Sequence, residues 1–535
     1  MGKTKLASFV FSYKVHRMNF AKVSSAQNTL LKARIINIEI DLSGGLNAFS
    51  IVGLPDKAVE ESKDRVSAAI KNSGFQSPKS KNQKVIVSLS PADLKKEGPL
   101  FDLPIALGYL LATEEIKFES SNKIFIGELS LDGKLQPMKG ILPLVQEAKK
   151  QGFEEVYLPK ENAPEAALID GVTIFGVKNL KEIIEHLDEK GDKEGNEIIK
   201  IQPEERSEIQ FEQTNFEFDF ADIKGQETAK RGLEIAAAGG HNVAMYGPPG
   251  TGKTMLAKAF SELLPALSFE EIIEITGIHS VAGALKETLI TKPPFRAPHH
   301  TSSYASLVGG GATPKPGEIT LAHRGVLFLD EFPEFEKRVL ESLRQPLEEK
   351  VVSVARAKVS AFFPADFILI AAMNPCPCGN FGVKGKECIC SPINIERYKR
   401  KVSGPIMDRI DLWLEVSKVD YEKLGEERGE SETKKVKERI NQARDFQEKR
   451  FLDAGLKIKT NNHLPAKHLM KILSLDEKLK EKFNEIAKKL DLSARSYHRI
   501  LKVSRTIADL ESCEKIEEKH LLEALQYRPK KVENI

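Results

Sequence analysis

One stretch near the middle of the chain constrains the fold more than any other. Residues 247–254 read Gly-Pro-Pro-Gly-Thr-Gly-Lys-Thr and fit the pattern G-x-x-x-x-G-K-[ST] of a phosphate-binding loop. An apolar run at 243–246 precedes this loop, and residues 255–264 follow with the spacing of a helix. This context favours a nucleoside triphosphatase with an α/β fold over the alternative, a glycine- and proline-rich turn that binds nothing.

The residues of this loop have distinct expected roles in binding ATP. Its glycines let backbone N–H groups wrap around phosphate oxygens, and the following helix directs its N-terminus at the same anion. Lys253 is expected to reach the β- and γ-phosphates, and the Thr254 hydroxyl to ligate Mg²⁺. The predicted nucleotide-binding residues of the loop are Gly247, Pro248, Pro249, Gly250, Thr251, Gly252, Lys253 and Thr254.

Two further apolar runs end in polar side chains that suit the same chemistry. Residues 325–329 lead into Asp330 and Glu331, and residues 367–373 lead into Asn374. Buried strands of a parallel sheet have this composition, although the acidic pair alone would equally fit a strand that ends in surface acids. We expect Asp330 to hold Mg²⁺ through water, Glu331 to orient and polarise the attacking water, and Asn374 to position that water.

The composition sets limits on the other functions to consider. The chain has 535 residues, of which 41% are hydrophobic, and a formal net charge of +3. Its length corresponds to roughly three or four domains. Because the net charge is small, DNA binding would depend on a local basic patch. The apolar runs are all too short for a membrane span, and the first residues lack the features of a signal peptide. We therefore expect a cytoplasmic protein without a membrane partner, for which Met18 is an alternative start.

Charge and hydrophobic patterning divide the chain into five segments. Residues 18–187 alternate strand-like and helix-like patterns, whereas 188–218 are rich in charged residues and glycine, as in a linker. The expected layout is an N-terminal extension at 1–17, an α+β domain at 18–187, the linker at 188–218, an α/β ATPase core with a cysteine cluster at 219–417, and a helical lid at 418–535.

Part of the first domain is similar to a known family. The segments 127–148 and 158–162, which begin Gly-Glu-Leu-Ser-Leu-Asp-Gly and Leu-Pro-Lys-Glu-Asn, resemble the proteolytic domain of Lon proteases. The resemblance implies an α+β fold of the ribosomal protein S5 domain 2 type. Lon proteases use a serine nucleophile and a lysine base, but the matching positions here are Leu100 and Leu142, which can neither attack a carbonyl nor carry a proton. We therefore expect the fold without protease activity.

A predicted β-hairpin supplies candidate contacts to DNA. Residues 350–363 alternate apolar and polar side chains, and Arg356 and Lys358 lie near the expected tip. In a ring-shaped assembly such a hairpin would point into the central pore, where the two cations would contact phosphates. The alternative is a solvated hairpin with two surface cations.

Four of the five cysteines are concentrated in one short segment. Cys376, Cys378, Cys388 and Cys390 form two C-x-C pairs on a glycine-rich stretch. Four thiolates can close a tetrahedral structural Zn²⁺ site, although C-x-C is tighter than the commoner C-x₂-C spacing. Zinc is the favoured interpretation, with reduced thiols and disulfides as alternatives.

Several cations outside the loop are candidates for contacting the nucleotide. Arg409 is the preferred arginine finger, which would reach the γ-phosphate bound to the neighbouring subunit, ahead of Arg397 and Arg400. An ion pair between Arg409 and an aspartate of the same chain is the alternative. Arg495, at the start of a predicted helix, is expected to contact the nucleotide of its own subunit. The pair His299–His300 is expected to line a loop near the nucleotide or substrate, with metal binding as the less favoured alternative.

Taken together, several segments resemble one family. They include Phe-Arg-Ala-Pro-His-His-Thr-Ser-Ser at 295–303, Asn-Pro-Cys-Pro-Cys-Gly at 374–379 and Ser-Gly-Pro-Ile-Met-Asp-Arg-Ile-Asp at 403–411. These motifs are similar to those of the ComM/YifB family of magnesium-chelatase-like AAA+ ATPases, and the resemblance runs from about residue 18 to 527.

The resemblance to this family implies a function. Its members are expected to be homo-hexameric ring motors on single-stranded or branched DNA, with helicase or branch-migration activity in homologous recombination during natural transformation. Two alternatives belong to other classes. One is a chelatase-type motor subunit that drives metal insertion into a tetrapyrrole, and the other is a chaperone-like or regulatory ATPase that acts on a protein client.

Overall fold

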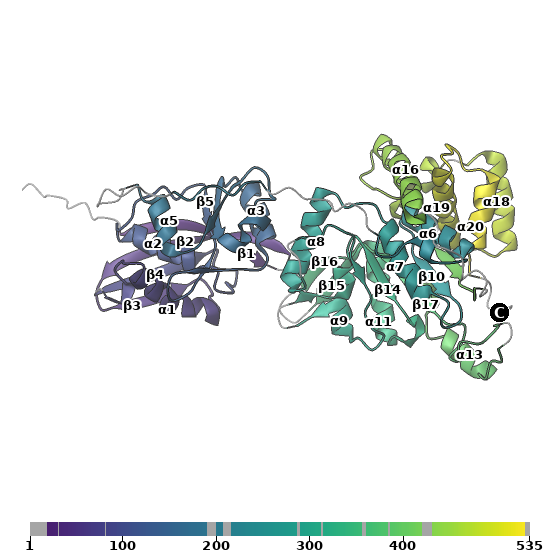
Figure 1. Ribbon diagram of the computed structural model, residues 1–535, viewed down its shortest axis with the longest axis horizontal. Coiled ribbons are helices and arrows are strands. Elements are labelled where there is room, and N and C mark those ends of the chain that lie inside the picture. Colours follow the sequence, from purple (N-terminus) through teal and green to yellow (C-terminus); the bar gives the residue numbers. More distant parts are fainter. Residues whose placement is uncertain are drawn as a thin grey trace, which may run out of the picture. The chain divides into compact units, whose positions relative to one another are not determined.

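The structure is a computed structural model that describes residues 19–29, 31–80, 82–189, 200–206, 216–285, 289–311, 314–355, 360–383, 386–419, 431–473 and 475–529. The chain divides into two compact units, residues 1–209 and 210–535 (Figure 1). The first holds the Lon-like domain, and the second holds the ATPase core and the helical region. Most of the expected linker, 190–199 and 207–215, lies outside the described residues.

The first unit is built on a seven-stranded mixed sheet with the strand order β3-β4-β2-β1-β5-β8-β9. Strands β1, β2 and β4 pair antiparallel, and the remaining neighbours pair parallel. The alternating pattern of β2 turns Ile36, Ile38 and Ile40 into the core, where all three are fully buried. The strands of this sheet are β1 (Phe20–Thr29), β2 (Lys32–Gly44), β3 (Ala48–Val52), β4 (Gln83–Ser90), β5 (Lys123–Phe125), β8 (Glu155–Pro159) and β9 (Thr173–Val177).

Helices and a small hairpin complete this unit. Helix α2 is apolar on all sides and packs against β1 and β2, which explains why nearly all of its residues are buried. The dipeptide Asp132-Gly133 predicts a hairpin turn, and the turn joins β6 (Glu128–Leu129) to β7 (Leu135–Gln136). The mixed architecture confirms the predicted Lon-like α+β fold. The helices are α1 (Lys57–Asn72), α2 (Asp102–Ala112), α3 (Ile141–Lys150), α4 (Ala163–Ala166) and α5 (Leu180–Leu187), with 3-10 turns at Pro78–Ser80 and Lys160–Asn162.

The second unit contains a five-stranded, wholly parallel sheet with the strand order β11-β14-β17-β10-β18. Its central strands consist of buried apolar residues, which confirms the predicted α/β core. Helices α6 and α7 pack against β18 and β17. The elements are β10 (Val243–Tyr246), β11 (Phe295–Arg296), β14 (Val326–Leu329), β17 (Ile368–Met373), β18 (Leu412–Glu415), α6 (Glu227–Gly239) and α7 (Lys253–Leu263), preceded by a 3-10 turn at Phe220–Asp222.

Further short elements surround this sheet. The amphipathic pattern of 334–345 predicts a single helix. The chain instead forms a 3-10 turn at Phe332–Glu334 and two short helices, α11 (Lys337–Ser342) and α12 (Arg344–Glu349). Pro346 lacks the N–H that one continuous helix would need at that position. The remaining elements are α8 (Phe269–Ala282), α9 (Tyr304–Val308), α10 (Glu318–Leu321), α13 (Pro392–Lys399), α14 (Gly404–Met407), β12 (Gly309–Gly310) and β13 (Lys315–Pro316).

The predicted β-hairpin is present. Strands β15 (Val351–Ala355) and β16 (Ser360–Pro364) pair antiparallel, with Val351 opposite Pro364 and Ala355 opposite Ser360. The tip at 356–359 carries Arg356 and Lys358 and lies outside the described residues.

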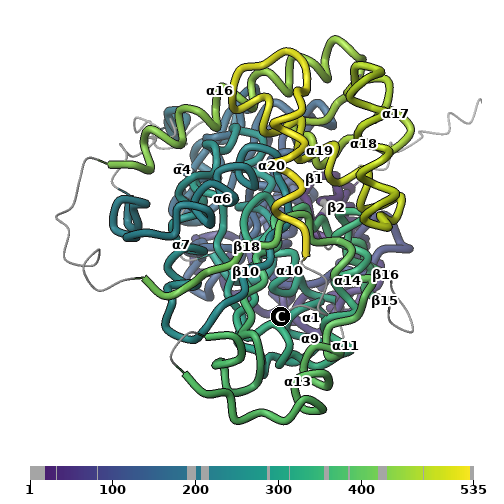
Figure 2. Tube along the Cα trace, turned by 90° about the vertical axis from the view of Figure 1, so that its right-hand side faces the viewer, coloured from purple at the N-terminus to yellow at the C-terminus, as the bar shows by residue number. Residues whose placement is uncertain are grey.

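The C-terminal region is helical, as expected for a lid. Helices α16 and α19 pack on α6, and Figure 2 shows α16 to α20 gathered in the upper part of the view. Within the part of the chain that the structure describes, none of the helices is both long and apolar enough to span a bilayer. These helices are α16 (Glu432–Asp453), α17 (Ala466–Ile472), α18 (Glu477–Lys489), α19 (Ala494–Leu510) and α20 (Glu518–Gln526), with a 3-10 turn at Asn461–His463.

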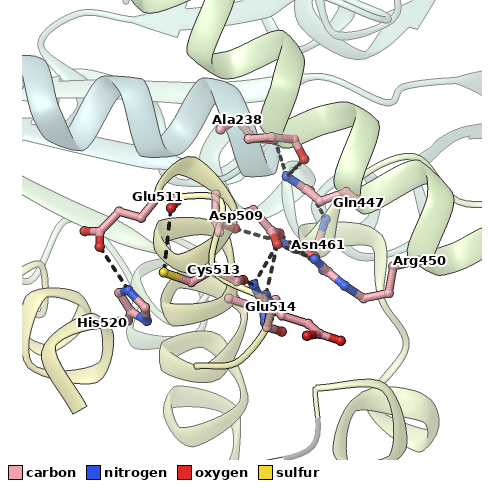
Figure 3. A network of polar contacts seen from close by, with 12 residues as sticks. Ala238, Gln447, Arg450, Asn461, Asp509, Glu511, Cys513, Glu514 and His520 are labelled. Atoms are coloured by element: carbon pink, nitrogen blue, oxygen red, sulfur yellow. Dashed lines mark hydrogen bonds and ion pairs between the residues drawn. The ribbon is translucent and has the colours of Figure 1, made fainter. Parts of the chain in front are cut away.

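A buried polar network ties the lid helices to the ATPase core (Figure 3). The carboxylate of Asp509 on α19 accepts hydrogen bonds from Arg450 on α16 and from Asn461, the latter at 2.9 Å. Gln447 accepts from the backbone N–H of Asn461 at 2.8 Å and donates to the carbonyl of Ala238 on α6 at 3.1 Å. Because buried polar groups are costly when unpaired, this network fixes the lid helices in one arrangement on α6.

Candidate nucleotide-binding site

Three loops meet at one edge of the parallel sheet. The phosphate-binding loop follows β10, the Asp330–Glu331 pair follows β14, and Asn374 follows β17. In the sheet β17 lies between β10 and β14, with Met245 opposite Ala372 and Leu329 opposite Ala371. The carboxyl ends of neighbouring parallel strands therefore bring the predicted nucleotide-binding residues together, as is usual for open α/β sheets.

Backbone geometry explains the glycines of the phosphate-binding loop. Gly252 has φ +87° and precedes α7, a left-handed conformation that favours glycine. A Cβ atom on Gly247 would lie 1.9 Å from the carbonyl oxygen of Val416, so only glycine fits there. The Thr251 hydroxyl donates to the Pro248 carbonyl at 3.0 Å. The loop is thus held in a defined shape directly before the N-terminus of α7.

The ammonium group of Lys253 is folded into this loop. Its Nζ donates to the carbonyls of Gly247 and Pro248 at 2.7 and 2.8 Å and to Oδ1 of Asn374 at 3.1 Å. Burial lowers the pKa of Lys253, and the charge of Asp330 acts in the opposite direction. Lys253 and Asn374 are therefore adjacent, as expected if both face the terminal phosphates.

Thr254 and Asp330 form the second contact across the sheet edge. The hydroxyl Oγ1 of Thr254 donates to Oδ2 of Asp330 at 3.1 Å. Hydroxyl and carboxylate oxygens are the ligands that Mg²⁺ prefers in nucleotide sites, with water and phosphate oxygens completing the shell. The two side chains thus fit a Mg²⁺ ion.

Glu331 adopts an unusual backbone conformation and contacts a histidine. Its φ is +49°, a left-handed value that costs a non-glycine residue about 1 kcal/mol or more. Its N–H donates to Oδ1 of Asp330 at 2.9 Å, and its half-exposed carboxylate has Oε2 2.8 Å from Nδ1 of His300. Surrounding contacts therefore hold Glu331 in a strained position at the edge of the nucleotide site.

The contact between His300 and Glu331 was not predicted. The sequence indicated only that His299 and His300 lie on a loop near the nucleotide or substrate. The two imidazole rings are tilted by 33° with centroids 4.2 Å apart, and Nδ1 of His299 lies 2.8 Å from the Thr301 hydroxyl. Among the described residues, neither histidine belongs to a cluster of three or more metal-ligating side chains.

The two candidate arginines meet at one carboxylate. Nη2 of Arg409 lies 2.6 Å from Oε1 of Glu348, and Nη2 of Arg495 lies 2.7 Å from the same atom. A hydrogen bond from Arg409 and the charges of the arginines lower the pKa of Glu348. The Arg409 side chain is only 8% exposed, whereas that of Arg495 is 53% exposed. Arg409 thus forms an ion pair within its own chain. Its partner is a glutamate, whereas the alternative drawn from the sequence was an aspartate.

The two less favoured finger candidates lie on the surface at the end of α13. Arg397 is exposed in the last turn of α13, and Arg400 is paired with Glu396. Within the described residues, neither side chain forms an ion pair with the Asp330–Glu331 pair or a hydrogen bond with the phosphate-binding loop.

The four clustered cysteines come together although two residues of their loop, 384–385, lie outside the described part. Their sulfur atoms lie within 4.8 Å of one another, and Cys376 is fully buried. The Sγ–Sγ distances are 3.4 Å for Cys376–Cys378, 3.7 Å for Cys376–Cys388 and 3.6 Å for Cys378–Cys388, so the thiols are free and not disulfide-bonded.

In the first unit, the positions that match the Lon catalytic pair lie in apolar surroundings. Leu142 is fully buried in α3, and Leu100 is partly buried before α2 and packs against the core. Neither side chain offers a nucleophile or a base.

Comparison with known protein families covers both units. The family model described as magnesium chelatase, subunit ChlI, matches residues 219–424. A model described as subunit ChlI of Mg-chelatase matches residues 38–162, and one for the ChlI C-terminal region matches residues 430–528.

Two individual proteins are similar over nearly the whole chain, and a third is similar over about a third of it. Competence protein ComM of Haemophilus influenzae is 42% identical over 96% of this chain and 98% of its own length. The protein YifB of Escherichia coli is 40% identical over 92% of this chain and 94% of its own length. Lon protease 2 of Bacillus subtilis is 28% identical over 36% of this chain and 39% of its own length.

Proposed function

The chain belongs to the ComM/YifB family of magnesium-chelatase-like AAA+ proteins, and from this premise we propose that it is an ATP-driven motor that moves DNA. In this proposal, six copies form a ring on single-stranded or branched DNA and drive unwinding and branch migration. The cellular process would be homologous recombination of incoming strands during natural transformation, in the cytoplasm. The name of the ComM relative, a competence protein, supports this assignment.

One observation carries the ATPase part of the proposal. Lys253 meets Asn374 at 3.1 Å, and Thr254 meets Asp330 at 3.1 Å, at a single sheet edge. In the proposed reaction Lys253 and the loop N–H groups bind the β- and γ-phosphates, and Thr254 and Asp330 hold Mg²⁺. A bound Mg²⁺ neutralises charge on the phosphate oxygens.

The attacking water is assigned to Glu331 and Asn374. The Glu331 carboxylate would orient and polarise the water, and the Asn374 amide would position it near the γ-phosphate. His300 would hold the Glu331 carboxylate in the orientation that polarises this water, because its Nδ1 lies 2.8 Å from that carboxylate. His300 is thus a positioning residue in this scheme.

Arg409 and Arg495 are proposed to act on the nucleotide of the neighbouring subunit. An arginine finger stabilises charge on the transferred phosphoryl group. Because both guanidinium groups lie against Glu348, we assign them to the same phosphate, whereas the sequence alone indicated the nucleotide of the same subunit for Arg495. In the assembled ring the γ-phosphate would take over from Glu348 as their anionic partner.

The DNA contacts are assigned to the β15–β16 hairpin. With a net charge of only +3, the chain needs a local cationic feature to bind a polyanion, and Arg356 and Lys358 at the hairpin tip would supply it. The Lon-like domain would serve as a binding or assembly module, since leucines occupy both positions of the protease pair.

A second candidate function is a chelatase-type motor subunit. The family models that match this chain carry the name of magnesium chelatase, which favours this alternative. Such a subunit would hydrolyse ATP to drive metal insertion into a tetrapyrrole carried by a partner protein.

Strand-displacement and porphyrin assays separate the two functions. We expect the purified protein to unwind a forked DNA substrate with ATP, and the Glu331→Gln variant to bind ATP without unwinding it. ATP turnover that a porphyrin stimulates, and DNA does not, would instead support the chelatase function.

A further inference from the structure

We propose that the four clustered cysteines hold a structural Zn²⁺ ion. The ion would fix the loop that carries these cysteines, and this loop in turn would hold the phosphate-binding loop through the contact of Gly379 with Pro249. The segment 376–390 is called the cysteine loop here. The zinc site rests on the sulfur geometry alone, whereas its effect on nucleotide binding also rests on the proposed ATPase function.

The sulfur geometry fits a tetrahedral ion. With Zn–S bonds of about 2.3 Å, the sulfur atoms of a tetrahedral site lie about 3.8 Å apart. The three distances given for Cys376, Cys378 and Cys388 are 3.4–3.7 Å, and Cys390 completes the group within 4.8 Å. A disulfide would require about 2.05 Å, so the arrangement matches a shared ion and not a covalent pair.

The surroundings of the sulfur atoms support thiolate ligands. The backbone N–H of Phe381 donates to Sγ of Cys376 at 3.3 Å. Such N–H donors stabilise a coordinated thiolate and orient it toward the metal. Without an ion, the close spacing of four sulfur atoms would add little stability, because thiols form only weak hydrogen bonds with one another. Four thiolate ligands suit zinc or iron among the biological metals, and we assign zinc as the redox-inert choice.

A second metal-like group in the chain lacks these features. Glu511, Cys513 and His520 also lie close together, near the polar network of Figure 3. Glu511 is already paired with the Lys519 ammonium at 2.6 Å, and the imidazole of His520 lies 3.2 Å from the same carboxylate oxygen. A cation in that position opposes binding of a metal ion, so Cys513 serves as an internal control.

The cysteine loop touches the phosphate-binding loop. Gly379 has φ +77°, and a Cβ atom built on it would lie 2.5 Å from Cδ of Pro249. The cysteine loop begins two residues after Asn374, whose Oδ1 accepts a hydrogen bond from Lys253. An ion that fixes the cysteines therefore fixes both Pro249 and Asn374. Loss of the ion is expected to loosen the phosphate-binding loop and weaken ATP binding while leaving the buried sheet intact.

Metal analysis of the purified full-length chain tests the site. We expect one zinc per chain in the wild type and in the control variant Cys513→Ser, and no stoichiometric zinc in Cys378→Ser/Cys388→Ser. Replacement by Co²⁺ should give the intense near-ultraviolet thiolate bands and the visible bands of a tetrahedral four-sulfur site. A chain that contains no metal, contains iron, or keeps its zinc in the double variant would overturn the proposal.

Two glycine variants test the coupling to Pro249. Gly379 and Gly382 have φ +77° and +72°, so an added methyl group strains both alike, but nothing lies within 4 Å of a Cβ on Gly382. Both variants should retain zinc. Binding of a fluorescent ATP analogue should weaken about tenfold in Gly379→Ala, corresponding to about 1.4 kcal/mol, and stay unchanged in Gly382→Ala. Equal affinities in the two variants, with zinc retained, would refute the coupling.

The outcomes distinguish this inference from the proposed function. Because nucleotide binding and metal content are measured without DNA, they do not depend on motor activity. A chain that holds zinc and shows the expected glycine effect, but never moves DNA, would refute only the proposed motor. A motor active on DNA without bound zinc would refute only the metal site.

Discussion

Arg409 and Arg495 place their Nη2 atoms 2.6 and 2.7 Å from the same oxygen, Oε1 of Glu348. Arg409 follows the short helix α14, and Arg495 lies in the first turn of α19, so the tertiary fold brings together two cations that are far apart in sequence. A buried or half-buried arginine pair needs an anion, and Glu348 supplies it in the single chain. In a ring, a phosphate of the neighbouring nucleotide would supply it instead.

Subunit mixing tests whether the nucleotide site is shared between copies. Lys253→Ala and Arg409→Ala proteins should each lose ATPase activity by about 10³-fold, because one lacks the phosphate-binding ammonium and the other the finger. In a random mixture, about one quarter of the interfaces combine an intact Lys253 with an intact Arg409, so part of the activity should return. A mixture of Arg409→Ala with Arg495→Ala, which also combines two inactive proteins, serves as a comparison. It should recover less, since both defects lie on the same side of the interface.

The contact of His300 with Glu331 predicts an effect on turnover and not on affinity. Replacing His300 by alanine should lower kcat by about tenfold with little change in KM for ATP, because Glu331 loses the group that orients it. His300→Gln should restore part of the rate through its amide N–H. The neighbouring His299→Ala, which removes the contact with Thr301 and the ring packing on His300 but leaves the contact of His300 with Glu331, is the control. If His300→Ala left kcat intact, or raised KM alone, His300 would have no positioning role.

The hairpin cations predict a change in the salt dependence of DNA binding. Removing Arg356 and Lys358 together should weaken binding of single-stranded DNA and make the slope of log K against log salt shallower, by about 0.7 for each lost phosphate contact. Fluorescence anisotropy at several salt concentrations measures both effects. Arg400→Ala removes an exposed arginine that is paired with Glu396, and it should change neither. An unaltered slope in the double variant would place the DNA contacts elsewhere.

A buried aspartate that accepts hydrogen bonds from the start of α16 predicts acid sensitivity of the second unit. Burial alone would raise the pKa of Asp219, but hydrogen bonds from the backbone of Ala221 and from Ser431 and Thr433 lower it to about 2, from an ordinary value of 3.8. A carboxylate whose pKa is lower in the folded than in the unfolded chain stabilises the fold at every pH above its unfolded pKa. For Asp219 this contribution is about 2 kcal/mol, and it is lost as the pH falls from about 4 to about 2.

The Asp219→Asn variant measures this contribution. It should lower the free energy of unfolding of the second unit by about 2 kcal/mol at neutral pH. The further decrease in this free energy between about pH 4 and pH 2 should be smaller than in the wild type. The single tryptophan, Trp413, lies in β18 and reports on this unit by fluorescence during urea unfolding. An equal loss of stability on acidification in variant and wild type would show that other groups cause it.

The core of the nucleotide site could be predicted from sequence because its signals are local. The pattern at 247–254, the apolar run before Asp330 and the run before Asn374 each define a strand and the polar group at its end. The parallel pairing of these strands then follows from their composition, and it brings the three ends to one edge. The β15–β16 hairpin was predictable for the same reason, since its alternation is continuous.

The features that sequence did not reveal depend on tertiary contacts or on single backbone angles. The left-handed φ of Glu331 and its contact with His300 have no local pattern. The sharing of Glu348 by Arg409 and Arg495 depends on how the lid helices pack on the core. The break between α11 and α12 follows from Pro346, which lies one residue beyond the helix predicted at 334–345 and could have indicated it.

The central claim is that ATP hydrolysis at the Lys253 site is coupled to DNA, and the steady-state ATPase rate with and without forked DNA tests it most directly. We predict that DNA stimulates the wild-type rate severalfold and that Glu331→Gln, which should still bind ATP, falls by about 10³-fold under both conditions. A wild-type rate that DNA leaves unchanged at saturating ATP, or a Glu331→Gln rate equal to that of the wild type, would contradict the account.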